Sequence, residues 1–177
     1  MKENANITEE IVNLLTGCNL FTGLEEQDLS KLLANSSSRI RTFQKGDLVA
    51  RAGDEVFFQH IILSGSVKGE MIDLSGKVIK IEDISPPRPL ATAFLFGNQN
   101  RYPVNIIANE SARVLSIPRD DFLRMMQVSE RVLRNFVNAV SSRGQSSPAR
   151  SGSFPSQPSK VNLPSTCLTL PASRERR

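Results

Sequence analysis

The stretch FQKGDLVARAGDEVFFQHIILSGSV, residues 43–67, decides the fold class of this chain of 177 residues. Glycine turns recur in this stretch and just after it, at intervals of 7, 12 and 11 residues, at Gly46, Gly53, Gly65 and Gly76. β-branched and aromatic residues occupy much of the sequence between the turns, as in strands. Short strands between regularly spaced glycine turns are typical of a β-sandwich or barrel. The sequence therefore predicts a mainly β core.

Outward from this stretch, alternating or β-branched segments predict further strands. The predicted strands are residues 39–43, 57–63, 67–72, 77–84, 104–108 and 112–117. The turn Asp73-Leu74-Ser75-Gly76 joins two of them into a hairpin. Residues 85–89 contain three prolines, which a central strand excludes, so we expect an irregular crossover there.

Helical segments are predicted on both sides of the strands. Asn6-Ile7-Thr8-Glu9 has capping-box spacing ahead of a first short helix. A second helix begins near Leu24, with acidic residues in its first turn, where they suit the helix dipole. Pro118 opens a third helical stretch after the last strand. The expected fold class is therefore mainly β (α+β), with helices at both ends.

A long amphipathic helix is predicted over residues 128–142. Its apolar positions follow one another at spacings of 1, 3, 1 and 3 and form one face, made of Val132, Leu133, Phe136, Val137 and Val140. Two interpretations stay open: this face packs on its own domain, or it pairs with a second copy as a coiled-coil-like seam. The expected organisation is a domain over residues 1–123, a dimerisation helix over 124–144 and a tail over 145–177.

The excess positive charge lies in the tail. The net charge of +4 and the isoelectric point of about 9.4 would suit a nucleic-acid binder. Residues 1–144, however, hold 17 basic and 17 acidic residues, whereas residues 145–177 hold five basic residues and one acid. The charge of the predicted domain therefore indicates no nucleic-acid surface. The tail also contains eight serines and five prolines without an apolar period, a composition typical of disorder.

Residue counts exclude several classes of function. The chain has one histidine, His60, and two cysteines, Cys18 and Cys167, which rules out a multi-histidine metal site and a four-cysteine cluster. Neither a nucleophile with its base nor a glycine-rich phosphate loop is present. There is no apolar run long enough for a transmembrane helix and no signal-peptide pattern. We expect a cytoplasmic protein that is not an enzyme and makes no membrane contact.

Four motifs, taken in order, carry a resemblance to a known family. They are Phe21-Thr22-Gly23-Leu24, Phe43-Gln44-Lys45-Gly46, Ala52-Gly53-Asp54 and Ile62-Leu63-Ser64-Gly65-Ser66-Val67. Their order and spacing resemble the effector domain of the Crp/Fnr transcription regulators, over about residues 20–143. The resemblance implies a cyclic-nucleotide-binding-type jelly roll, a double-stranded β-helix, followed by a dimerisation helix and a helix-turn-helix that reads DNA.

The resemblance also implies partners. We expect a homodimer that senses a small-molecule effector and that contacts DNA only as an intact full-length form. The alternative is a stand-alone module that acts through a protein partner of its long helix. When residues 146–168 are read one base out of register, degenerate codons permit a sequence that resembles the family's next helix. We therefore expect a frameshift near codon 145 that removes the DNA-binding domain; the alternative is a natural serine- and proline-rich linker.

The effector site that the resemblance implies lies between residues 90 and 108. Cyclic-nucleotide binders of this fold use a Gly-Glu pair for the ribose and an Arg-Ser or Arg-Thr pair for the phosphate, which align with Ala91-Thr92 and Tyr102-Pro103. Both charged anchors are absent, at a cost of about 2–5 kcal/mol each, so cyclic AMP is not the expected effector. The implied pocket residues are Thr92, Phe94, Phe96, Arg101, Tyr102, Val104 and Ile106.

Residues 90–96 and 102–110 look more like one branch of the family, the regulators of the hybrid-cluster-protein gene, some of which bind haem. An apolar pocket suits haem or another hydrophobic ligand. The alternative is that these side chains simply fill the barrel. His60 is the candidate axial haem ligand, or else a packing residue of its strand. The cofactor is therefore left open.

Overall fold

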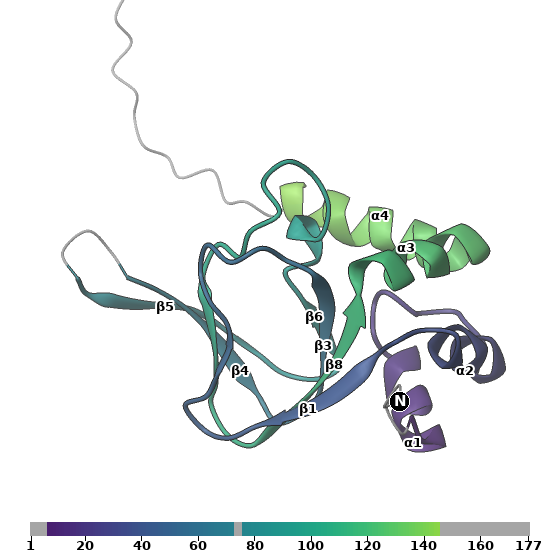
Figure 1. Cartoon of the computed structure of the whole chain (residues 1–177), viewed down its shortest axis with the longest axis horizontal. Coiled ribbons are helices and arrows are strands. Elements are labelled where there is room, and N and C mark those ends of the chain that lie inside the picture. The colour runs from purple at the N-terminus through teal and green to yellow at the C-terminus, as the bar shows by residue number, and fades with distance from the viewer. Residues whose placement is uncertain (1–6, 73–75, 146–177) are drawn as a thin grey trace, which may run out of the picture. The chain divides into compact units, whose positions relative to one another are not determined.

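The computed structural model describes residues 7–72 and 76–145. Its core is a jelly roll of two four-stranded sheets, in which every neighbouring pair of strands is antiparallel (Figure 1). The first sheet has the order β1 (Arg39–Phe43), β8 (Ala112–Pro118), β3 (Phe58–Ser64), β6 (Arg88–Leu90). The second sheet has the order β2 (Leu48–Ala50), β7 (Asn105–Ala108), β4 (Val67–Ile72), β5 (Val78–Ile84). The mainly β core predicted from the glycine turns and the jelly roll implied by the resemblance are both confirmed.

The helices cover one side of this roll. They are α1 (Glu9–Thr16), α2 (Glu26–Ala34), the short 3-10 helix η1 (Thr92–Phe94), α3 (Arg119–Val128) and α4 (Glu130–Gln145). Figure 1 shows α1, α2 and α3 on the side of the first sheet that faces away from β4 and β5. Buried apolar side chains fill the space between them, among them Leu15, Phe21, Ile61, Leu115 and Phe122. Burial of this apolar surface is the main force that holds the helices on the sheet.

The structure differs from the predicted elements in three places. The proline-rich crossover contains a short strand, β6, which includes Pro89 and pairs with β3 over residues Arg88–Leu90. Proline is tolerated there because β6 is at the edge of its sheet and needs no second ladder of hydrogen bonds. The three-residue strand β2 was not predicted, because so short a segment has no detectable alternation. Thr8 is the N-cap residue of α1, but its side chain makes no capping hydrogen bond.

The helical C-terminal part consists of two helices, at the places expected for the helical stretch after Pro118 and for the amphipathic helix over residues 128–142. Ser129 has extended dihedral angles and separates α3 from α4. The boundary expected between residues 123 and 124 falls inside α3, which is anchored by the buried side chains of Phe122 and Met126. Of the tail predicted over residues 145–177, Gln145 is the last residue of α4, and residues 146–177 lie outside the described residues. Within the described part of the chain, no helix is long and apolar enough to cross a membrane.

Candidate functional site

A small cavity lies beside His60 on one face of the first sheet. Its volume is about 190 Å³. It is lined by residues of the adjacent strands β1, β8 and β3 and by Ser37, which precedes β1. The lining residues are Ser37, Arg39, Arg41, Phe58, His60, Ser116 and Pro118. Strand register explains this set. Ser116 is paired with Arg39 on one side and with His60 on the other. Because side chains alternate along a strand, residues two positions away share the same face.

His60 is held by contacts on several sides. Its Nδ1 lies 2.8 Å from Ser116 Oγ. Its ring is stacked with Phe58 at 5.9 Å between centroids and with Tyr102 at 6.4 Å. Burial, and secondarily the positive charge of Arg41, lowers the pKa of His60 to about 4. The imidazole is therefore neutral at pH 7, and either ring nitrogen can be the donor.

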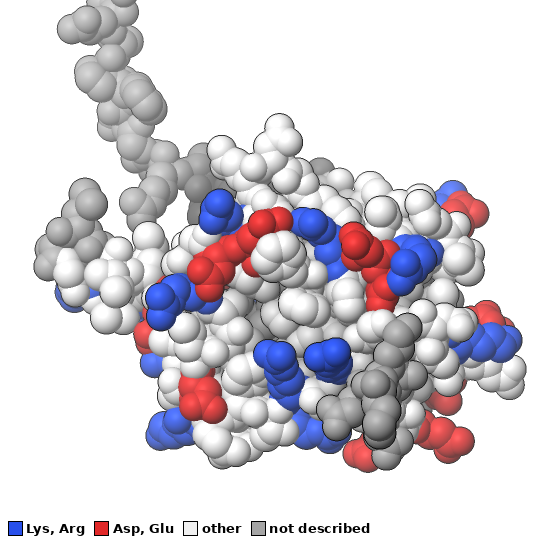
Figure 2. Space-filling model, in the orientation of Figure 1, with Lys and Arg blue, Asp and Glu red and all other residues white. Residues whose placement is uncertain are grey.

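Two arginines border this cavity. Arg39 and Arg41 are exposed, and neither guanidinium makes a hydrogen bond or ion pair with any residue that the structure describes. In Figure 2 the face drawn is hollowed near its centre, and basic side chains lie at the edge of the hollow over β1. Arg39 and Arg41 are the basic residues of β1. The rim of the cavity therefore carries positive charge that nothing in the described part of the chain compensates.

The residues predicted to form the effector pocket differ in their burial and in the residues that they contact. Tyr102 is buried against His60, and burial raises the pKa of its hydroxyl to about 12. Arg101 is exposed, and its Nη1 donates to the Gly53 carbonyl at 2.7 Å. Ile106 is buried in the core, and Val104 is half-buried.

The remaining predicted pocket residues face the helical side. Thr92 lines a cavity of about 460 Å³ that also involves Asn135 and Ala139 of α4. Its Oγ1 is buried and has no hydrogen-bond partner among the described residues. Phe94 and Phe96 are half-buried against the core, and the ring of Phe96 meets that of Phe136 edge-on at 5.6 Å. The segment around η1 therefore packs directly on α4.

Ala91, at the position where the family's glycine aligns, has a φ of 50°. This is the left-handed region that glycine adopts without strain and alanine does not. Ala91 therefore has the left-handed backbone conformation that glycine favours, although its side chain makes this conformation less favourable.

The apolar residues predicted for the dimerisation helix lie on two neighbouring stripes of α4. Val132 is fully buried and Phe136 is half-buried, and both pack on their own domain. Asn135 strengthens this contact, since its Nδ2 donates to the carbonyls of Leu20 and Thr22 at 3.1 and 2.9 Å. Leu133 and Val137 remain 43% and 51% exposed. Packing on its own domain therefore holds for Val132 and Phe136, whereas pairing of the exposed part with a second copy stays a prediction.

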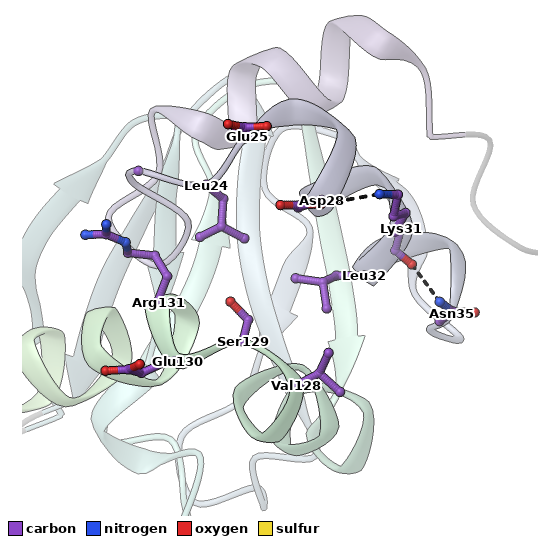
Figure 3. Close-up of a pocket in the computed structure, with 11 residues that line it drawn as sticks. Leu24, Glu25, Asp28, Lys31, Leu32, Asn35, Val128, Ser129, Glu130 and Arg131 are labelled. Atoms are coloured by element: carbon purple, nitrogen blue, oxygen red, sulfur yellow. Dashed lines mark hydrogen bonds and ion pairs between the residues drawn. The ribbon is translucent and has the colours of Figure 1, made fainter.

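A groove of about 750 Å³ lies between α2 and the junction of α3 with α4. Figure 3 shows Leu24, Leu32 and Val128 around its interior, with charged side chains nearer its edge. Lys31 is paired with Asp28 at 3.4 Å. The groove contains none of the predicted site residues and mixes acidic with basic groups, so it indicates no particular ligand.

The residues around His60 do not fit haem. The cavity of about 190 Å³ is smaller than the roughly 300–1,000 Å³ of pockets for drug-sized ligands, and haem is at least as large as such ligands. One ring nitrogen of His60 is also engaged with Ser116. Among the described residues there is no group of three or more histidine, cysteine or acidic side chains that could hold a metal ion.

Sequence reasoning identified His60 but missed its neighbours. The pattern that could have found them is Arg39-x-Arg41, Phe58-x-His60 and Ser116-x-Pro118, each with the period of two of a strand face. The pattern becomes meaningful once the strands are known to be adjacent, and that adjacency is not visible in the sequence.

Comparisons with known proteins identify the family. The family model for the cyclic nucleotide-binding domain matches residues 40–129. A transcriptional regulator from Thermotoga maritima is 32% identical, with a TM-score of 0.61 over 66% of this chain and 89% of that one. The sensor domain of the transcriptional regulator DNR from Pseudomonas aeruginosa is 24% identical, with a TM-score of 0.64 over 74% and 86% of the two chains.

The catabolite activator protein of Thermus thermophilus shares the fold at 20% identity and a TM-score of 0.65, over 72% of this chain and 58% of that protein. No curated protein matches the chain. The family model covers half of the sequence and coincides with the jelly roll, α3 and the start of the α3–α4 junction. The chain therefore belongs to the cyclic nucleotide-binding domain family, and transcriptional regulators are among its structural neighbours.

Proposed function

We propose that this chain is the sensor and dimerisation module of a Crp/Fnr-type transcriptional regulator whose effector is not cyclic AMP. The packing of the η1 segment on α4 carries this proposal. Phe96 contacts Phe136, and Phe136 in turn contacts Phe122 of α3 at 5.9 Å. A ligand that changes the position of residues 90–108 would act directly on α4. Such a ligand can shift the helix between two arrangements only if it binds one of them more tightly.

Two features of the segment argue against cyclic AMP as the effector. Thr92 stands where the family has the carboxylate for the ribose, and Tyr102 stands where it has the arginine for the phosphate. Tyr102 is moreover buried against His60, and the nearby Arg101 is bound to Gly53. No guanidinium of this segment is available for a cyclic phosphate.

Titration calorimetry with cyclic AMP is expected to show a Kd of roughly 1 mM or weaker, because both charged anchors are replaced. Cyclic GMP, which presents the same phosphate and ribose, is the matched comparison and is expected to behave alike. A micromolar Kd for either nucleotide would contradict this part of the proposal.

Leu133 and Val137, which are exposed on α4, are expected to form the seam of a homodimer. Light scattering should then give twice the 19.6 kDa mass of one chain at micromolar concentration. The double variant Leu133→Glu/Val137→Glu places carboxylates in this seam, and we expect the dimer Kd to rise roughly 100-fold. The monomer should stay folded because both side chains are exposed in it.

Leu123→Glu provides the matched control for the dimer experiment. Leu123 lies on α3 and is 41% exposed, close to the value for Leu133. This variant is expected to keep the mass of the unsubstituted protein. A monomeric mass for the unsubstituted chain would overturn the dimer and would favour a stand-alone module that binds a different protein through α4.

The frameshift near codon 145 stays a prediction. Resequencing the coding DNA from about codon 140 tests it. An open frame with Phe-Leu-Ser at codon 146, followed by a helix-turn-helix, would support the full regulator. A confirmed serine- and proline-rich frame without such a continuation would favour the stand-alone module.

A further inference from the structure

We propose that the cavity beside His60 binds a small organic carboxylate, with its charged group between Arg39 and Arg41 and its apolar body against Phe58. This site lies on the β1-β8-β3 face, and its lining includes none of the four residues where the family's nucleotide anchors align, Ala91, Thr92, Tyr102 and Pro103. Of these four, Tyr102 stacks on His60 but does not line the cavity. The inference concerns ligand binding by one chain and does not depend on the dimer.

The charge of the cavity rim favours an anion. The guanidinium groups of Arg39 and Arg41 have no partner among the described residues. The acidic side chain connected with the lining is Asp121, which accepts a hydrogen bond from the Ser37 backbone N–H at 2.6 Å and is paired with Arg124. Asp121 is thus already neutralised and is not part of the lining. A planar guanidinium can donate two parallel hydrogen bonds to a carboxylate, which makes carboxylates its preferred partners.

The floor of the cavity offers a further donor. Neutral His60 carries one ring proton, and its Nδ1 is close to Ser116 Oγ. When the Ser116 hydroxyl donates to Nδ1, the ring proton is on Nε2. Nε2 has no hydrogen-bond partner among the described residues, so it can donate to a ligand oxygen.

The size and apolar surface of the cavity define the rest of the ligand. A water molecule occupies roughly 30 Å³ of liquid, so about 190 Å³ corresponds to about six water molecules. Covalently bonded atoms take up less volume each than separate water molecules, so a ligand of roughly ten heavy atoms or fewer has the matching size. Phe58 and His60 are stacked with an interplanar angle of 21°, and Pro118 adds a further apolar surface. A flat ring is the shape that packs well on such a surface. Benzoate, with nine heavy atoms, has the size, the shape and the charge that these features require.

The ring signals of His60 provide the readout. His60 is the single histidine of the chain, so its imidazole resonances need no further assignment. In the full chain at pH 7, addition of benzoate is expected to shift these resonances in a saturable manner. Benzamide, which has the same shape without the charge, is expected to bind at least tenfold more weakly. Inorganic phosphate, which has the charge without the ring, is also expected to bind more weakly than benzoate.

Two double variants separate a local site from general electrostatic attraction. Arg39→Gln/Arg41→Gln is expected to weaken benzoate binding at least tenfold. Arg51→Gln/Arg113→Gln removes the same charge from two other exposed arginines and is expected to stay within twofold of the unsubstituted chain. All four side chains are exposed, so both variants should fold, which circular dichroism can check.

The outcomes are distinguishable. Equal weakening in both double variants, equal binding of benzamide, tighter binding of phosphate, or no saturable shift would each overturn the proposal. The mass of each sample, measured alongside, reports on the homodimer separately. Benzoate binding by a monomeric chain would support this inference while contradicting the proposed dimer, and a dimer without benzoate binding would do the reverse.

Discussion

Gly65→Ala is expected to lower the free energy of unfolding by about 3 kcal/mol, through left-handed strain and overpacking together. Gly65 joins β3 to β4 with a φ of +71°. A Cβ atom there would lie 2.3 Å from the Ser111 carbonyl oxygen and 2.9 Å from Ala112 Cα. Both contacts are with backbone atoms, just before β8 and at its start. To relieve the clash, the turn at Gly65 would have to move away from the turn that precedes β8.

Gly53→Ala is the matched control for this prediction. Gly53 also has a positive φ, of +86°, but a Cβ there would meet nothing within 4 Å. Only the left-handed strain remains, and we expect a loss of about 1–2 kcal/mol. Urea denaturation followed by circular dichroism measures both values. An equal decrease in the free energy of unfolding in the two variants would contradict the prediction, because the close approach to Ser111 would then not contribute to the loss of stability.

Acid is expected to destabilise the protein through His60. In the unfolded chain this imidazole has its ordinary pKa of 6.5, whereas burial, and next the charge of Arg41, lowers its pKa to about 4 in the fold. As the pH falls from 6.5 to 4, the unfolded state therefore binds the proton first, and the free energy of unfolding decreases. The stabilisation that neutral His60 provides is fully present above pH 6.5. Its complete loss at low pH lowers the free energy of unfolding by about 3 kcal/mol.

The variant His60→Gln isolates this effect from the carboxylates that also titrate in acid. Urea denaturation at a series of pH values should show a smaller loss of stability between pH 6.5 and 4 for His60→Gln than for the unsubstituted chain. Tyr102, which stacks on the ring, stays neutral over this range because burial raises the pKa of its hydroxyl to about 12. A His60 pKa near 6.5, read from its ring resonances in the folded protein, would contradict the prediction.

The two predictions concern residues in and next to the same strand, β3. Gly65 follows β3 and sets its distance from the turn before β8, whereas His60 lies within β3 and contacts β8 through Ser116. The pairing of β3 with β8 therefore determines both the stability of the roll and the geometry of the cavity. A variant that shifts this register should affect benzoate binding and stability together.

Local chemistry in the sequence determined most of the secondary structure. Glycine turns at Gly46, Gly53 and Gly65 separate short strands whatever the rest of the fold does, because a positive φ is favourable for glycine alone. The hairpin of β4 and β5 likewise follows from local alternation around Gly76. The resemblance of these ordered turns to a known family extended the local signal to the jelly roll.

Tertiary structure alone decided the candidate site and the division of α4. The period of 3.6 places Val132 and Leu133 on adjacent stripes, but it does not state which stripe meets the jelly roll. The stripe of Val132 and Phe136 meets it, because Val132 is fully buried and the ring of Phe136 packs against Phe96 and Phe122. The His60 cavity depends on β1, β8 and β3 lying side by side, although Arg39 and Ser116 are far apart in the chain. Periodicity predicts only the helix or strand to which a residue belongs, whereas a site depends on which helices and strands lie next to one another.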